Sequence, residues 1–169
     1  MSIPETQNPE PKRVSHGRRN AFAIAVFLVV VVLFSFTFKM AVVRGDSMLP
    51  TYHDGQYLLV NKVRALTGKL NRGDVVLISH ANDVLVKRVA YLPGDVIPPE
   101  EYFSFMRVAE FFDIARPGAQ GSSFPSLKVP ENYIVVLGDN RRVSEDSRLF
   151  GPVKEGDVIG RVVNAPPKP

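Results

Sequence analysis

Residues 21–38 read AFAIAVFLVVVVLFSFTF, a run of 18 residues without a charge in which only Ser35 and Thr37 are polar. At about 1.5 Å per residue a helix over this run spans about 27 Å, close to the roughly 30 Å hydrocarbon core of a bilayer. Backbone groups in lipid must bond one another, which favours a helix. The run therefore predicts a transmembrane anchor over residues 21–39.

The residues before the apolar run set the orientation of the predicted anchor. Two acidic and four basic residues give residues 1–20 a net charge of +2, half of the +4 of the chain; the basic ones are Lys12, Arg13, Arg18 and Arg19. By the positive-inside rule, residues 1–20 form a cytoplasmic tail and residues 40–169 are exported. Half of the net positive charge behind the pI near 9.5 is thus interpreted as the signal that orients the anchor. We therefore expect no nucleic-acid partner.

Two other interpretations of the apolar run stay open, a cleaved signal peptide and a buried core helix. The run is longer than the 7–15 apolar residues typical of a signal peptide. Lys39-Met40-Ala41 after it is also a poor cleavage site. An uncleaved anchor is favoured.

Residues 40–169 carry the pattern of an all-β domain. Short runs rich in β-branched and aromatic residues alternate with turn signals such as Asp54-Gly55 and Pro93-Gly94-Asp95. Runs of this length and spacing are typical of antiparallel β-sheets or barrels. The predicted strands are residues 56–60, 74–79, 84–90, 132–137 and 157–163.

Residues 98–128 interrupt the strand pattern and are interpreted as an insertion. A short helix is expected around Phe105–Ile114, and residues 118–123 are expected to be flexible. Its aromatic residues suit either the core or a membrane interface, where amphipathic rings settle. The Pro-rich tail, residues 164–169, is expected to be disordered.

The chain has no Cys, so disulfides, thiolate nucleophiles and Cys-based metal sites are excluded. Ser47 lies in an irregular turn, GDSMLPT (45–51), and a Ser nucleophile needs a base. His53 and His80 belong to no recognisable triad or metal motif. Lys87 would share a strand face with Leu85 and Val89, and loss of hydration there would lower its pKa. An ordinary turn Ser and an edge-strand Lys remain the alternatives.

Taken together, several segments resemble type I signal peptidases, the membrane-anchored Ser/Lys endopeptidases of the S26 type. They occur in the family's order: GDSMLPT (45–51), RGDVVLI (72–78), VKRVAYLPGD (86–95), and VPENYIVVLGDN (129–140) leading into GDNRRVSEDSRLFGPV (138–153). The resemblance covers nearly all of residues 20–163 outside the insertion. It implies a signal-peptidase-like antiparallel β-sheet or barrel domain with one N-terminal transmembrane helix.

The resemblance also implies a role for each matching residue. Ser47 would be the nucleophile, and Lys87 the general base and later the general acid. Ser144 would hold the Lys amine, while Asp146 with Arg148, and Asp139, would support the site. The backbone N–H of Ser47 would bind the oxyanion. Gly45 stands where some members carry a second oxyanion donor, a Ser hydroxyl, so that donor is absent here.

Substrate would bind by β-augmentation between residues 41–44 and 83–86, with pockets for small side chains. The expected lining residues are Ala41, Val43, Met48, Leu85 and Val86. The implied partners are preprotein signal peptides cleaved after small-x-small sites and the phospholipids of the bacterial inner (cytoplasmic) membrane. We expect a monomer that uses no metal and no cofactor.

Three other functions compete with this interpretation. A peptidase of a conjugative-transfer system that processes one pilin stays open, because site details and not the fold set specificity. An inactive signal-peptide-binding homologue is disfavoured by the complete set Ser47, Lys87 and Ser144. A self-cleaving repressor is disfavoured because the anchor stands where a DNA-binding module would be.

Overall fold

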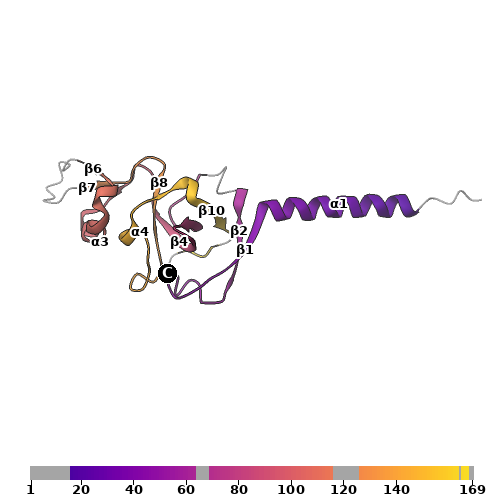
Figure 1. The fold of residues 1–169 in the computed structure, drawn as a ribbon, viewed down its shortest axis with the longest axis horizontal. Helices are drawn as coiled ribbons and strands as arrows, with labels where there is room; N and C mark the ends of the chain where they lie inside the picture. Colours follow the sequence, from indigo (N-terminus) through magenta and orange to yellow (C-terminus); the bar gives the residue numbers. More distant parts are fainter. Residues whose placement is uncertain (1–15, 64–68, 116–125, 164, 168–169) are drawn as a thin grey trace, which may run out of the picture. The chain divides into compact units, whose positions relative to one another are not determined.

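A computed structural model describes residues 16–63, 69–115, 126–163 and 165–167. The chain divides into two compact units, Met1–Ser35 and Phe36–Pro169. Helix α1 (His16–Thr37) begins five residues before the predicted run, and most of it lies in the first unit (Figure 1). Its Asn20–Thr37 part is long and apolar enough to cross a membrane, with a mean hydropathy of 2.5. Residues 1–15, most of the predicted tail, lie outside the described residues.

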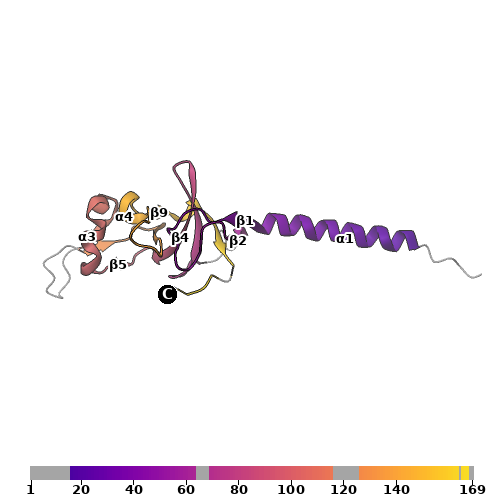
Figure 2. The same ribbon diagram turned by 90° about the horizontal axis from the view of Figure 1, so that it is seen from below.

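The second unit is built on a seven-stranded sheet whose pairings are all antiparallel, which confirms the predicted β-domain (Figures 1 and 2). Among the described strands, the one at each end of the order has a single neighbour, so these strands form an open sheet. In spatial order the strands are β1 (Phe38–Val42), β2 (Tyr57–Asn61), β10 (Val158–Val162), β3 (Val75–His80), β4 (Asp83–Tyr91), β8 (Tyr133–Leu137) and β9 (Val153–Lys154).

Burial explains why these runs form strands. In β3, Val75 to Ile78 are all buried, so the strand is covered on both faces. Leu77 packs into one apolar cluster with Val60 and Met48, and Ile78 packs into a second with Val136. All five predicted strands form, each within one residue of its expected bounds. β1 was not predicted, because its residues continue the apolar anchor without a turn signal.

The insertion forms a separate small sheet in the order β5 (Val96–Ile97), β7 (Ser126–Lys128) and β6 (Asp113–Ala115). Ahead of β6 come three short helical turns: η1 (Pro99–Glu101), α3 (Tyr102–Phe105) and η2 (Met106–Phe111). Within the second unit, the small sheet and α3 lie at the end away from β1 and β2 (Figures 1 and 2).

The prediction of a helix at Phe105–Ile114 is wrong at both ends. The helical turns begin earlier, and Ile114 lies in β6 because it pairs with Leu127. Phe105 and Phe112 are buried edge to face, with ring centroids 5.6 Å apart, and form a core for the insertion. Residues 118–123, expected to be flexible, lie outside the described residues.

Two further elements among the described residues are helix α4 (Ser147–Phe150) and turn η3 (Glu155–Asp157). Of the tail that we expected to be disordered, residues 165–167 are described. Ala165 packs against the first apolar cluster, and the carbonyl of Pro166 accepts a hydrogen bond of 3.0 Å from Arg88. This part of the tail therefore contacts the domain.

Candidate active site

Ser47 lies in an irregular turn between β1 and β2. Backbone hydrogen bonds hold the turn at Ser47 and at the residue after it. The N–H of Asn140 donates a hydrogen bond of 3.0 Å to the carbonyl of Ser47, and the N–H of Tyr52 donates one to the carbonyl of Met48. The Ser47 hydroxyl is therefore presented by a fixed backbone next to the turn that follows β8.

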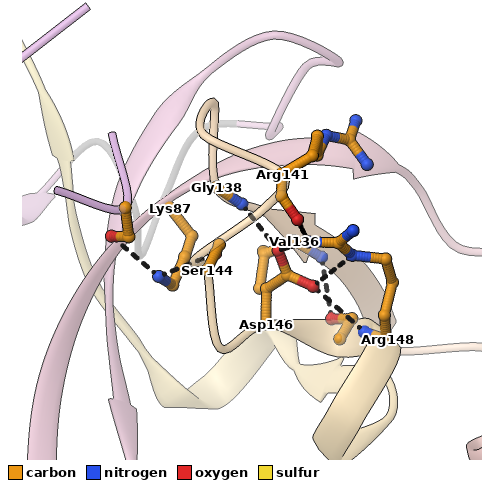
Figure 3. Close-up of polar contacts among 9 residues, drawn as sticks. Lys87, Val136, Gly138, Arg141, Ser144, Asp146 and Arg148 are labelled. Carbon is orange, nitrogen blue, oxygen red and sulfur yellow. Dashed lines mark hydrogen bonds and ion pairs between the residues drawn. The ribbon is translucent and has the colours of Figure 1, made fainter. Parts of the chain in front are cut away.

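Lys87 brings the two serines of the predicted site together (Figure 3). Its Nζ lies 3.0 Å from Oγ of Ser47 and 3.2 Å from Oγ of Ser144. The three residues are far apart in sequence, and Lys87 and Ser144 are both buried. The two histidines considered as bases and set aside have other contacts: His80 stacks on Phe150 with centroids 4.0 Å apart, and the backbone N–H of His53 donates to the side chain of Gln56.

The environment of Lys87 favours the neutral amine. Burial lowers its pKa below the usual lysine value, because removing an ammonium from water is costly. The nearby Asp146 and Glu145 carboxylates raise the pKa in part, and Arg148 lowers it again. The net shift is downward. The shift is toward the neutral amine, the form that can accept a hydroxyl proton, and the amine lies within hydrogen-bond distance of the Ser47 hydroxyl.

Asp146 is a fully buried carboxylate beside Ser144. It accepts hydrogen bonds from Nε and Nη2 of Arg148, at 2.8 and 2.9 Å, and from the N–H of Gly138 at 3.0 Å (Figure 3). Burial alone would raise its pKa, but these donors and the Ser144 hydroxyl outweigh burial and lower it. Asp146 therefore stays ionised and fixes the segment that carries Ser144.

A second buried ion pair, which sequence reasoning missed, joins three segments around Ser47. Arg88 and Asp139 are bonded at 2.7 Å with side chains only 6% and 2% exposed. The hydroxyl of Thr51 donates a hydrogen bond of 2.6 Å to Oδ2 of Asp139, the oxygen that also accepts from Nη2 of Arg88. Asp139, predicted to support the site, contacts Arg88 and Thr51. The only sequence signal was that both stand inside the matching motifs.

Gly138 fits a space that no side chain could share. A β-carbon at this position would overlap the Ser144 hydroxyl and would lie 2.5 Å from the carbonyl of Ser47. Since the neighbouring atoms belong to the site itself, a side chain here must displace Ser144, Ser47 or both.

We therefore expect Gly138→Ala to lower kcat/KM about tenfold to a hundredfold, because small misplacements of reacting groups are that costly. Gly156→Ala is the matched control, since a β-carbon there meets nothing within 4 Å. Peptide cleavage and urea unfolding of both variants would be measured. Full activity of Gly138→Ala would contradict the tight packing.

A groove leads to the Ser47–Lys87 pair between β1 and the start of β4. It has a volume of about 510 Å³, and residues of both strands line it. All five predicted substrate-binding residues are in this lining: Ala41, Val43, Met48, Leu85 and Val86. β1 is an edge strand, and residues 83–87 of β4 pair only with β3 among the described strands. Each wall of the groove therefore offers a free strand edge.

The backbone N–H groups of Gly45 and Ser47 differ in whether they are free to donate a hydrogen bond to an oxyanion. The N–H of Gly45 already donates to the Asp54 carboxylate at 2.7 Å, so it is not free to bind an oxyanion. Within the described part of the chain, the N–H of Ser47 makes no hydrogen bond. Gly45 has φ +76°, a backbone conformation that favours glycine. Its contribution is thus to the shape of the turn.

The chain matches a family model, and the names of two similar proteins agree with the description of that family. The model, described as signal peptidase, peptidase S26, matches residues 17–102 and 107–165. Signal peptidase IB of Staphylococcus aureus (strain COL) is 32% identical over 160 residues, 83% of this chain and 84% of that protein. Signal peptidase I of Bacillus caldolyticus is 37% identical over 169 residues, 89% of this chain and 91% of that protein.

Among solved structures, the crystal structure of a signal peptidase I from Enterococcus faecalis V583 is 27% identical, with a TM-score of 0.39, and covers 57% of this chain and 98% of that one. The family model spans most of the chain, including Ser47, Lys87 and Ser144. The chain belongs to the signal peptidase family, peptidase S26.

Proposed function

We propose that this chain is a membrane-anchored serine endopeptidase, a type I signal peptidase that cleaves signal peptides from exported preproteins with Ser47 and Lys87. The observation that carries the proposal is the 3.0 Å approach of a buried, pKa-lowered Lys87 amine to the Ser47 hydroxyl. Family membership supports the peptidase activity. The roles of the two residues rest on their geometry.

In the proposed reaction the neutral Lys87 amine removes the proton of Ser47 as its oxygen attacks the scissile carbonyl. The resulting oxyanion accepts a hydrogen bond from the N–H of Ser47, which is the kind of preset donor that acyl transfer requires. The Lys87 ammonium then protonates the leaving amine. Water, deprotonated by Lys87, hydrolyses the acyl-enzyme and restores both groups. Ser144 holds the amine in line throughout.

The groove is the proposed binding site for the cleavage region of the signal peptide. An extended peptide between β1 and β4 would bond to both free edges, as in strand addition. Four antiparallel steps separate β1 from β4 in the sheet, so the two strands run in the same direction, toward Ser47 and Lys87. A peptide that runs alongside them reaches Ser47 with the residue before the scissile bond.

Small side chains suit the proposed subsites because the groove floor is already filled. Met48 and Val43 are buried in the domain core and also line the groove, which leaves little depth beneath a bound peptide. We propose that Leu85, Val86 and Ala41 complete pockets for the first and third residues before the cut. Small-x-small sites would then be accepted and large side chains refused.

The apolar α1 supports attachment to the membrane. We propose that residues 1–20 stay in the cytoplasm of a bacterial cell, that α1 spans the inner (cytoplasmic) membrane once, and that residues 40–169 face outward as the catalytic domain. Ser47 follows the end of α1 by ten residues, so it would meet signal peptides held in the same bilayer. Confinement raises their effective concentration.

The proposal is tested with detergent-solubilised full-length protein and two fluorogenic peptides. One peptide has Ala at the first and third positions before the scissile bond, and the other has Phe at both. We expect cleavage of the Ala peptide at the single predicted bond and at least about tenfold slower cleavage of the Phe peptide, because buried large side chains would overpack the pockets. Mass spectrometry locates the cut. Equal rates, or no cut in the Ala peptide, would contradict the proposal.

A further inference from the structure

Four arginines line a hollow that also includes Ser144, the contact of Lys87. Arg107 comes from η2, Arg141 and Arg142 come from the turn after β8, and Arg148 comes from α4. With Ser104 and Ser144, these four line one hollow of about 300 Å³. We call the four residues the basic surface. No acidic residue lines this hollow among the residues that the structure describes.

Most of the charge on the basic surface is unpaired. Arg107 and Arg142 are exposed, and within the described ranges neither they nor Arg141 form an ion pair. The Nε of Arg141 is buried without a hydrogen-bond partner. Arg148 differs, because Asp146 already holds it. Exposed arginines on neighbouring segments repel one another unless an anion lies between them.

The basic surface is continuous with the reacting atoms. Arg141 and Arg142 also line a second hollow, of about 490 Å³, together with Pro50 and Asn140. Pro50 follows Ser47 by three residues, and the N–H of Asn140 bonds to the carbonyl of Ser47. The hydroxyl of Ser144, which lines the first hollow, contacts Lys87. A chain that leaves the site past Ser47 therefore meets the basic surface within a few residues.

From this placement we infer that the basic surface binds acidic side chains in the first residues of the mature protein, just after the scissile bond. The inference rests on the proposed function, because it extends the direction in which the peptide runs along β1 and β4. The residues before the cut occupy the groove, so those after it lie toward Asn140 and Arg142. Carboxylates match the fork of an arginine guanidinium, and Arg142 and Arg107 are the two that solvent-exposed carboxylates can reach.

An anionic lipid surface is the competing occupant, since exposed Phe103 and Leu149 line the same hollow. The peptide is favoured because Ser144 contributes to that hollow and also contacts the Lys87 amine. The mature protein begins at the scissile bond, so a site for its first residues must adjoin Ser47 and Lys87. A site for lipid headgroups has no such requirement.

The test uses full-length protein in neutral detergent at low salt. Three peptides share an Ala-x-Ala site and differ only at the second and third residues after the scissile bond: Glu-Glu, Gln-Gln or Lys-Lys. We expect kcat/KM for the Glu peptide to exceed that for the Gln peptide about threefold to tenfold, since exposed ion pairs are weak. The Lys peptide should be the poorest, and high salt should shrink the differences.

Charge reversal locates the effect. R107E/R142E should reverse the order of the Glu and Lys peptides and leave the Gln peptide nearly unchanged. K69E/K154E makes the same change in net charge at exposed lysines outside the basic surface and should keep the wild-type order. A Glu preference that survives in R107E/R142E would overturn the assignment.

The remaining outcomes separate the competing occupants. If the Glu and Gln peptides are cleaved equally, and anionic lipid in the micelle stimulates wild type but not R107E/R142E, the surface binds lipid headgroups and the inference is wrong. Equal cleavage without a lipid effect also overturns it while the proposed function stands. If no peptide is cleaved, the proposed function itself fails.

Discussion

Replacing Ser47 with Ala should abolish cleavage of a preprotein while the domain remains folded. The hydroxyl is the only atom removed, and no described hydrogen bond of the fold depends on it except the contact with Lys87. Loss of the nucleophile should lower kcat roughly 10⁴-fold or more, as expected when one member of a catalytic unit is deleted. The rate is measured by gel analysis of a preprotein in detergent or proteoliposomes.

Ser79→Ala is the matched control for the nucleophile, because Ser79 is exposed at the end of β3. It should cleave at the wild-type rate, and both variants should unfold at the same urea concentration. Cleavage by Ser47→Ala within tenfold of wild type would disprove the assignment of the nucleophile.

Lys87→Met should reduce kcat about 10³-fold or more, because general-base catalysis is lost along with activation of the nucleophile. The apolar part of the side chain is retained, so packing against the strand is largely kept. At neutral pH the variant should be at least as stable as wild type. Folding lowers the pKa of Lys87, so between its folded and unfolded pKa values the folded protein binds fewer protons than the unfolded chain. The free energy of unfolding of wild type therefore falls as the pH falls through that range.

The same shift predicts the pH profile of wild type. Activity should rise with pH while Lys87 loses its proton and level off below the pKa of an ordinary lysine, because burial lowers the pKa of this one. Lys154→Met, at an exposed lysine of β9, should keep the wild-type rate and profile. A rate that stays flat from pH 5 to 9 would contradict a lysine base.

The strands could be predicted because local pattern and tertiary role agree in them. Residues 75–78 are an uninterrupted apolar run, and all four are buried in β3. β1 escaped prediction because Phe38–Val42 has the composition of the membrane run before it, and only its pairing with β2 makes it a strand. The helix predicted over Phe105–Ile114 extends too far for a related reason. Ile114 is part of a strand because it pairs with Leu127, and the local sequence does not show that pairing.

The candidate site could be predicted in part. A strand pattern was enough to suggest that Lys87 is desolvated, since its neighbours are aliphatic. The contact of Lys87 with Ser144 joins residues 57 positions apart, and only the family resemblance indicated it. Nothing in the local sequence linked Arg88 to Asp139, because a buried ion pair depends on which segments the sheet brings together. Gly138-Asp139-Asn140 has the composition of a turn, but the feature that requires glycine at 138 is close packing against Ser144 and the carbonyl of Ser47.

The two free strand edges that border the groove also affect how the domain behaves in the absence of substrate. Exposed edges invite pairing between molecules and hence aggregation, unless charges oppose it. Lys39 and Arg44 lie along one wall of the groove. Pairing of two molecules through this segment would bring these positive charges of both molecules to one seam. Their mutual repulsion disfavours such self-association, whereas a signal peptide without a charge at these positions meets no such barrier.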